Sequence, residues 1–191
     1  MAPLIYRAIL LAALGTCLVS FFGGMRNAFV LPRRATSGMK ITAISGTFFA
    51  LLHFCVILAS TNVWAPRVFA AVLLYLSALS LFWWTVIITG RRRLPACFTR
   101  IEPSILVTDG QYRLVRHPFY TSYLIAWGAG TLATLNPWLL FTSLAMCTLY
   151  IFAARAEEKA LLKGVHSAEY LDYCNRTGMF FTWRRRKRNA V

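Results

Sequence analysis

Long apolar runs alternate with short polar connections along most of this chain. A helix rises about 1.5 Å per residue and a hydrocarbon core is about 30 Å thick, so a run of about 17 to 25 apolar residues can cross a membrane. Runs of this kind cover residues 8–24, 41–60, 66–89, 119–135 and 137–154. The pattern predicts an all-α fold: an integral membrane bundle of five transmembrane helices.

Turn-forming residues separate the predicted helices. We expect Gly23-Gly24 to close the first helix, and Gly90 precedes a run of arginines after the third. Asn136-Pro137 leaves room for only a tight turn, so the fourth and fifth helices should pack as an antiparallel hairpin. The start of the fourth helix and the end of the fifth would then lie at the same membrane face.

Composition and charge agree with a membrane protein and set its orientation. The chain is 58% hydrophobic and 14% charged, whereas soluble domains are about 25% charged. Its net charge of +15 would suit nucleic acid, yet all basic residues except Arg7 and Arg67 lie in the connections 25–40 and 90–118 and from residue 155 onward. This alternation with the apolar runs argues against a nucleic-acid partner. The positive-inside rule places the basic regions in the cytoplasm, which puts the N-terminus outside. The first span lacks a signal-peptide cleavage site, so we expect it to be retained.

A shorter cytosolic helix should follow the fifth span, with a break near Gly164. Apolar residues recur there at helical spacing, at Leu161, Leu162, Val165, Tyr170 and Tyr173. The last residues are basic without an apolar period, which favours contact with anionic lipid over nucleic acid. We expect one membrane domain over 1–191, with three helices in 1–89, the other two spans and the polar segments in 90–183, and a basic tail in 184–191.

Isolated cysteine and histidine residues favour packing over chemistry. The five cysteines are scattered without C-x-x-C spacing, which predicts no metal site. His53 lies in the middle of the second span, where a histidine is more often packed or hydrogen-bonded than catalytic. Candidate chemistry therefore concentrates in the second half of the chain.

Ionisable residues gather at the ends of the fourth and fifth spans. Pro118 suits the first turn of a helix, so His117 should be its N-cap, where the helix dipole attracts anions and Arg116 would add charge. Glu157 and Glu158 follow the fifth span and could hold a cation or hydroxyl groups. The two ends together suit an amino-acid zwitterion, although these side chains could equally pair with each other at the interface.

Several motifs, in this order and spacing, resemble one family of membrane enzymes. They are Leu106-Val-Thr-Asp-Gly110-Gln-Tyr112-Arg-Leu-Val-Arg116-His-Pro-Phe-Tyr120, Asn136-Pro137, Arg155-Ala-Glu157-Glu158 and Glu169-Tyr170-Leu-Asp-Tyr173. Over residues 100–180 they resemble the isoprenylcysteine carboxyl methyltransferase family, and related phospholipid N-methyltransferases share parts of the pattern. The first half resembles that family only in being helical membrane spans.

The resemblance implies transfer of a methyl group from S-adenosylmethionine at a cytosolic pocket built without a Rossmann fold. The chain indeed has no G-x-G-x-x-G after a strand pattern. The implied cofactor-binding residues are Leu106, Val107, Tyr112, His117, Pro118, Phe119, Tyr120 and Glu158. Arg155 corresponds to the family's substrate-facing arginine, and Glu157 would take that role if the register is shifted.

The resemblance gives a C-terminal isoprenylcysteine carboxylate, or a similar lipophilic acceptor, as the leading substrate. A carboxylate is already ionised at neutral pH, so Arg155 would orient it and no general base would be needed. An amine or thiol acceptor would need a base, for which His117, Glu157 and Tyr120 are candidates. A methyltransferase acting on a phospholipid, thiol or isoprenoid is therefore an alternative within the same superfamily.

Two further alternatives fall outside methyl transfer. A membrane sterol or quinone reductase has a loosely similar C-terminal motif, but this chain of 191 residues is short for one. A non-enzymatic membrane scaffold would use the basic tail to dock lipid or partners. The chain is also short beside the eukaryotic family members, which favours a prokaryotic cell membrane over the endoplasmic reticulum.

Overall fold

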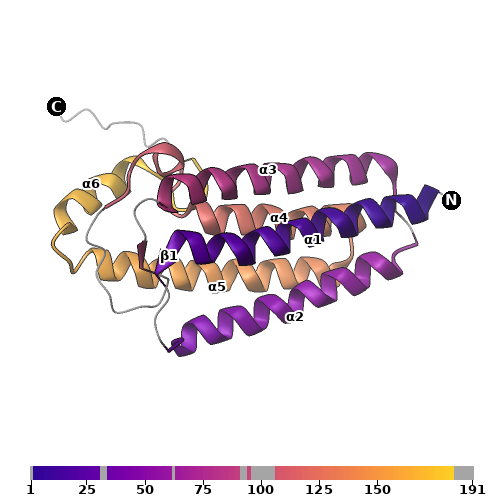
Figure 1. Ribbon diagram of the computed structural model, residues 1–191, viewed down its shortest axis with the longest axis horizontal. Coiled ribbons are helices and arrows are strands. Elements are labelled where there is room, and N and C mark those ends of the chain that lie inside the picture. The colour runs from indigo at the N-terminus through magenta and orange to yellow at the C-terminus, as the bar shows by residue number, and fades with distance from the viewer. Residues whose placement is uncertain (1, 31–33, 62, 91–93, 96–105, 183–191) are drawn as a thin grey trace.

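The computed structural model describes residues 2–30, 34–61, 63–90, 94–95 and 106–182. Five long helices lie side by side along one axis, and a shorter sixth helix lies at one end of them (Figure 1). They are α1 (Ala2–Ala28), α2 (Ser37–Ala59), α3 (Ala65–Gly90), α4 (Pro118–Thr134), α5 (Pro137–Leu161) and α6 (Ser167–Arg176). The helical class predicted from the apolar pattern is confirmed.

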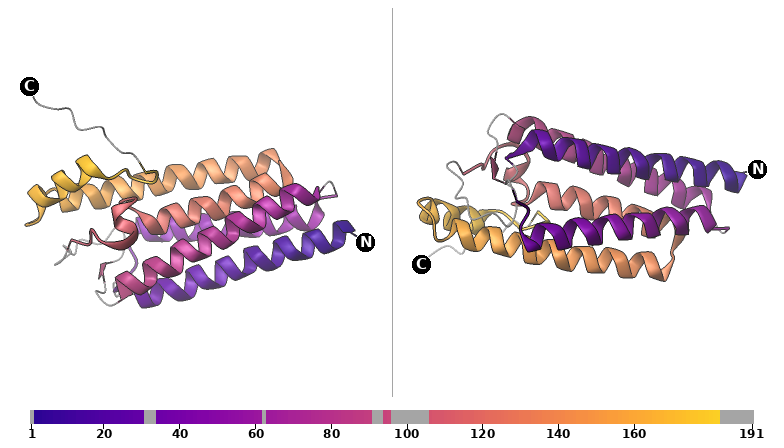
Figure 2. Two further views of the ribbon diagram at one scale, coloured as in Figure 1. Left: turned by 90° about the horizontal axis from the view of Figure 1, so that it is seen from above. Right: turned by 60° about the horizontal axis from the view of Figure 1, so that its bottom comes forward.

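Short elements join the helices. β1 (Phe29–Val30) follows α1 and pairs in parallel with β2 (Leu94–Pro95), which follows α3. A 3-10 helix, η1 (Gly110–Arg113), precedes α4. Figure 2 shows α6, in yellow, at the opposite end of the bundle from the N-terminus. The predicted basic tail, 184–191, lies outside the described residues.

Four of the described helices, α1, α2, α3 and α5, are long and apolar enough to cross a membrane. Their outer faces carry large exposed apolar side chains, such as Ile44, Phe69 and Phe141, which lipid would cover. The remaining long helix, α4, has 17 residues and packs against α3 and α5. Its buried residues include the small Ala126, Ala129, Gly130 and Ala133 and the large Phe119, Tyr120 and Trp127.

The predicted bounds of the first helix are wrong, and packing explains one of the differences. α1 begins at Ala2 rather than at residue 8 and continues to Ala28. Gly24 does not end the helix but lies against Phe82 of α3, whose ring would overlap a Cβ at that position. The glycine is therefore a point of close approach between α1 and α3, and the helix runs through it.

The predicted antiparallel hairpin of α4 and α5 is confirmed. Leu135 adopts a left-handed conformation with a φ of 50°, and the side chain of Asn136 caps α5 by accepting from a backbone N–H at 2.9 Å. α5 then continues to Leu161 rather than ending at residue 154, so Glu157 and Glu158 lie in its last turns. The start of α4 and the end of α5 meet at the end of the bundle where α6 lies (Figure 1).

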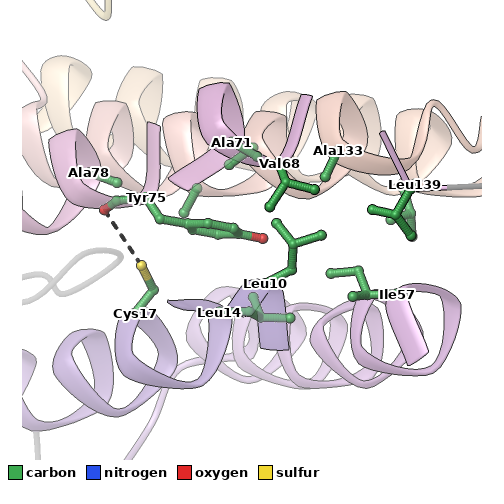
Figure 3. Close-up of a cluster of buried hydrophobic side chains, with 13 residues drawn as sticks. Leu10, Leu14, Cys17, Ile57, Val68, Ala71, Tyr75, Ala78, Ala133 and Leu139 are labelled. Carbon is green, nitrogen blue, oxygen red and sulfur yellow. Dashed lines mark hydrogen bonds between the residues drawn. The ribbon is translucent and has the colours of Figure 1, made fainter. Parts of the chain in front are cut away.

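Buried side chains from α1 to α5 form the core of the bundle (Figure 3). Leu10 and Leu14 of α1 pack there with Tyr75 of α3. His53 of α2 is fully buried beside this core, and its Nε2 lies 2.8 Å from Thr142 Oγ1 of α5. The packed, hydrogen-bonded role predicted for this histidine is confirmed.

Candidate functional site

The polar end of the bundle is organised around the first turn of α4. His117 is the N-cap of this helix and Pro118 is its first residue, as the sequence predicts. The backbone N of Arg116 donates to the carbonyl of Gly178 at 2.8 Å, and that of His117 donates to Met179 at 3.1 Å. We call the segment 177–180, which follows α6, the C-terminal strap. It anchors the backbone just before α4.

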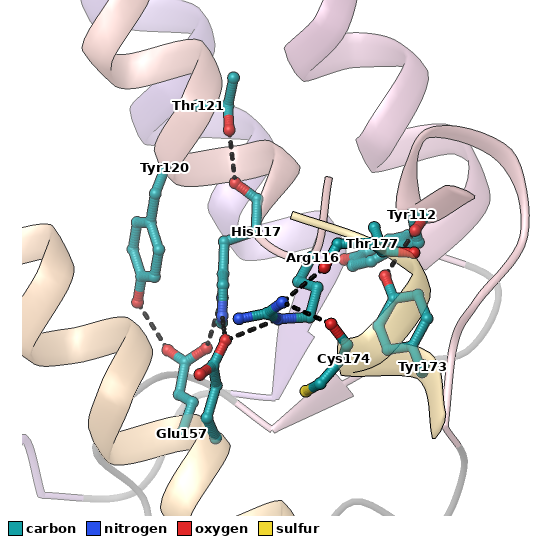
Figure 4. Close-up of polar contacts among 10 residues, drawn as sticks. Tyr112, Arg116, His117, Tyr120, Thr121, Glu157, Tyr173, Cys174 and Thr177 are labelled. Carbon is teal, nitrogen blue, oxygen red and sulfur yellow. Dashed lines mark hydrogen bonds and ion pairs between the residues drawn. The ribbon is translucent and has the colours of Figure 1, made fainter. Parts of the chain in front are cut away.

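Both ring nitrogens of His117 face carboxylates of α5 (Figure 4). Nδ1 lies 3.5 Å from Glu157 Oε2, and Nε2 lies 3.0 Å from Glu158 Oε1. The His117 side chain is 8% exposed, compared with 15% for Glu158 and 31% for Glu157. The antiparallel hairpin therefore brings together the three residues that the sequence placed at its two ends.

The two carboxylates control the protonation of His117. Burial alone would lower the pKa of its imidazole, but the hydrogen bonds and negative charges of Glu157 and Glu158 outweigh burial and raise the pKa. A protonated imidazole donates from both nitrogens, which suits two acceptors. The site thus favours the protonated form of a shielded histidine.

Arg116 contacts the same cluster through its guanidinium. Its Nε donates to Glu158 Oε1 at 2.8 Å, and its Nη1 donates to the carbonyls of Thr177 at 2.5 Å and Cys174 at 3.4 Å. Burial opposes the charge of Arg116, but the hydrogen bond and charge of Glu158 outweigh it, so the pKa of Arg116 is raised. The sequence suggested that Arg116 would help to bind an anionic ligand, whereas its guanidinium bonds groups of the protein itself.

Tyr120 connects the polar cluster to the interior of the bundle. Its hydroxyl donates to Glu157 Oε1 at 2.6 Å, and its ring stacks on Tyr150 with centroids 5.2 Å apart. Tyr150 in turn lines a mainly apolar cavity of about 150 Å³ between α1, α2, α4 and α5. The lining residues are Leu14, Cys17, Leu18, Phe21, Gly46, Tyr123, Ala126, Trp127 and Tyr150.

The predicted residues upstream of α4 form an aromatic wall beside the cluster. The wall is made of Val107, Tyr112, Tyr170 and Tyr173, with Leu106 packed against it. The hydroxyl of Tyr112 lies 3.3 Å from Thr89 Oγ1 of α3, and its backbone carbonyl accepts a hydrogen bond from the Tyr173 hydroxyl. Figure 4 shows Tyr112 and Tyr173 on the opposite side of the cluster from Tyr120. The wall is thus tied to both α3 and α6.

Two predicted site residues lie away from the polar contacts. Phe119 points into the core, where its ring lies 5.5 Å from that of Phe82. Arg155 is exposed and forms no ion pair with another described residue. Residues two apart on a helix are separated by about 200°, so Arg155 and Glu157 occupy opposite faces of α5. The structure does not bring Arg155 to the cluster.

Two features of this end of the bundle escaped the sequence analysis. The C-terminal strap places the Phe180 ring 6.0 Å from that of His117, and its carbonyl accepts from Thr121 Oγ1 at 3.3 Å. The apolar pair Phe180-Phe181 ahead of the basic run was a weak signal for it. The side-chain amide of Gln111 is fully buried, and neither its nitrogen nor its oxygen is hydrogen-bonded to another described residue, which no pattern in the sequence signalled.

One family model covers the two helices whose ends form the cluster. Residues 66–168 match the sequence model of a family described as phospholipid methyltransferase. The chain is also similar to a protein named Methanethiol S-methyltransferase 1 from Bradyrhizobium diazoefficiens, with 38% identity over 74 residues. That stretch covers 39% of this chain and 25% of the other protein, so the chain spans about a quarter of this relative's length. The family match includes α4 and α5, with His117, Glu157 and Glu158.

Proposed function

We propose an activity for this chain from one premise: it belongs to the phospholipid methyltransferase family, whose sequence model matches more than half of its residues. The proposed activity is transfer of a methyl group from S-adenosylmethionine to an acceptor at the membrane surface. The observation that carries it is the contact of His117 with both Glu157 and Glu158 at the end of the α4–α5 hairpin. Shielded ionisable groups beside a membrane are costly and point to a ligand.

The residues around this contact suit a cofactor that carries an amino acid and a ribose. The carboxylate of Glu158 would accept from an ammonium or from ribose hydroxyls, and the N-terminus of α4 at His117 favours a carboxylate. The proposed cofactor-binding residues are Leu106, Val107, Tyr112, His117, Pro118, Phe119, Tyr120 and Glu158. Bound S-adenosylmethionine would supply an electrophilic methyl group on a sulfonium.

Methyl transfer by displacement requires the protein to align the two reactants and exclude water. Arg155 and Glu157, on opposite faces of α5, are the two proposed alternatives for the residue that contacts the acceptor. Glu157 is half-buried and accepts a hydrogen bond from Tyr120, which supports it as the residue closer to the proposed cofactor site. Arg155 would orient an acceptor carboxylate that reaches the outer face of α5.

The leading acceptor class is lipophilic, with an isoprenylcysteine carboxylate as its first member. The apolar cavity supports this class, because one of its lining residues is Tyr150, whose ring stacks on Tyr120 of the site. An apolar part of the acceptor would lie between the helices, with its carboxylate at the polar end of the bundle beside the cofactor. Such a carboxylate needs no general base.

A small thiol is the second candidate acceptor. The similar Bradyrhizobium protein is named as a methanethiol methyltransferase. The cavity of about 150 Å³ is also well below the range of about 300–1,000 Å³ that encloses drug-sized ligands. A cavity of this size would hold a small acceptor whole, or only part of a prenyl chain. A thiol must lose a proton, which the carboxylate of Glu157 would accept.

We also propose that α4 is a fifth membrane crossing. Its 17 residues are at the short end for a span, but it runs antiparallel to α5 within the bundle (Figure 1). With five crossings the N-terminus lies outside and the site and C-terminus lie in the cytoplasm, where the positive-inside rule puts the basic connections. The proposed location is a prokaryotic cell membrane.

Titration calorimetry with S-adenosylhomocysteine, the product form of the cofactor, tests this assignment on the purified protein in detergent. We expect binding that His117→Ala or Glu158→Ala weakens at least about tenfold, about 1.4 kcal/mol, because each removes a charge-assisted hydrogen bond. His166→Ala is the matched control, since His166 precedes α6 and pairs with Glu169 at 3.4 Å. Lack of binding by the wild type, or full affinity in both folded variants, would remove the assignment.

Methyl incorporation separates the two acceptor classes. Labelled S-adenosylmethionine would be supplied with a farnesylcysteine analogue, with extracted lipids and with a short alkanethiol in parallel reactions. A methylated farnesylcysteine analogue favours the isoprenylcysteine carboxylate as acceptor. A methylated alkanethiol with no other product favours the small thiol. Oxidation of NADPH without methyl transfer would instead favour a reductase.

A further inference from the structure

Arg116 is a shielded charge of the site that has no role in the proposed reaction. Its side chain is 13% exposed, so it is not an ordinary surface arginine. Its guanidinium joins the acid Glu158 on α5 to the carbonyls of Cys174 and Thr177 (Figure 4). One side chain thus links the proposed cofactor site to the end of α6.

The chemistry of a guanidinium suits this double contact. Its N–H groups point in fixed, planar directions, so one arginine can hold a carboxylate and a carbonyl in a set relation. Thr177 is the C-cap of α6, and the carbonyls at a helix C-terminus lack partners within the helix and favour a cation. Arg116 therefore satisfies the end of α6 and positions Glu158 at the same time.

The hydrogen bonds to Glu158 fall on one of its two oxygens. Arg116 Nε and His117 Nε2 both bond Oε1, at 2.8 and 3.0 Å. Among the described residues no hydrogen bond to Oε2 is found, and the side chain is 15% exposed. A carboxylate held through Oε1 keeps Oε2 available in a fixed direction for an outside donor.

We propose that Arg116 is a positioning residue for the cofactor. By holding Oε1 it presents Oε2 of Glu158 to the ammonium or ribose hydroxyls of S-adenosylmethionine. Through the carbonyls of Cys174 and Thr177 it also makes cofactor affinity depend on the docking of α6 and the C-terminal strap. This role rests on the proposed function, because it requires that Glu158 contacts the cofactor.

A double-mutant cycle tests whether Arg116 acts through Glu158. S-adenosylhomocysteine would be titrated into the wild type, Arg116→Met, Glu158→Gln and the double variant. We expect Arg116→Met alone to weaken binding about tenfold, but to change affinity less than about twofold when Glu158→Gln is already present. Losses that add in the double variant would show that Arg116 acts elsewhere and would overturn the proposal.

Conservative and control variants distinguish a loss of cofactor affinity from a loss of folding. Arg116→Lys keeps the charge, but a single ammonium cannot reproduce the fork, so we expect an affinity between those of the wild type and Arg116→Met. Arg113→Met, at an exposed arginine of η1, should bind like the wild type. Full affinity in Arg116→Lys or Arg116→Met overturns the proposed role and leaves the proposed function standing. Failure of the wild type to bind removes the proposed function itself.

Discussion

The imidazole of His117 is stabilised as a cation by groups that its own helix does not supply. An N-cap position alone disfavours a positive charge, because the helix dipole presents its positive end there. Glu157 and Glu158 reverse that preference across the hairpin, at 3.5 and 3.0 Å. At the residue scale, burial and the helix dipole therefore oppose the charge of His117, and the two adjacent carboxylates outweigh them.

Stability should depend on pH through His117. Its pKa is raised above the ordinary value of 6.5, so the folded protein binds this proton more tightly than the unfolded chain does. The resulting stabilisation is complete below about pH 6.5 and is lost as the pH rises through the folded-state pKa. We expect the thermal midpoint in detergent to fall as the pH rises above about 6.5, and His117→Gln to remove much of this fall. An equal slope in the variant and the wild type would contradict this assignment.

Close contacts between helices depend on where single glycines lie. Gly24 faces Phe82, which is fully buried, whereas a Cβ at Gly23 would meet no atom within 4 Å. At the element scale, neighbouring and chemically identical positions of α1 thus have opposite roles. One allows α1 and α3 to approach, and the other faces open space.

This difference predicts opposite effects of the same substitution. Gly24→Ala should destabilise the protein by about 1–3 kcal/mol, because the rigid ring of Phe82 cannot move away easily. Gly23→Ala should be neutral or stabilise it by up to about 1 kcal/mol, since alanine is the better helix former. Thermal unfolding of the two variants in one detergent measures the difference. A stabilising Gly24→Ala would show that α1 and α3 are not in close contact there.

The arrangement of the whole molecule puts the site at one end of the bundle and the N-terminus at the other (Figures 1 and 2). Exposed apolar side chains cover the outer faces of the four candidate spans. Both observations fit a bundle embedded in lipid with its chemistry at one membrane face. The positive-inside rule predicts that the site end of the bundle faces the cytoplasm.

Thiol labelling in cells tests that orientation. Thr61→Cys lies between α2 and α3, and Ala168→Cys lies in α6 at the site end; both positions are exposed. A membrane-impermeant maleimide should label Thr61→Cys in intact cells, and Ala168→Cys only after permeabilisation. The wild type, with its native cysteines, gives the background. Labelling of Ala168→Cys in intact cells would place the site outside.

The sequence by itself determined the features that depend on local patterns. Apolar runs of spanning length specified the helices, the Asn136-Pro137 turn specified the hairpin, and Pro118 specified the helix start with His117 as N-cap. The proximity of His117 to the two glutamates followed from the same hairpin. These inferences needed only helix geometry and the chemistry of a few turn residues.

The tertiary structure decided the features that depend on contacts between distant residues. Arg116 could not be assigned to Glu158 and α6 from spacing, because its partners lie 42 and 61 positions away. Gly24 breaks helices by propensity but is retained in α1 because α3 packs against it. Packing also decides which face of α5 is buried, so that Glu157 lies at the cluster and Arg155 is exposed. A local pattern limits which conformations are possible, whereas packing and charge pairing across the bundle select the partner of each side chain.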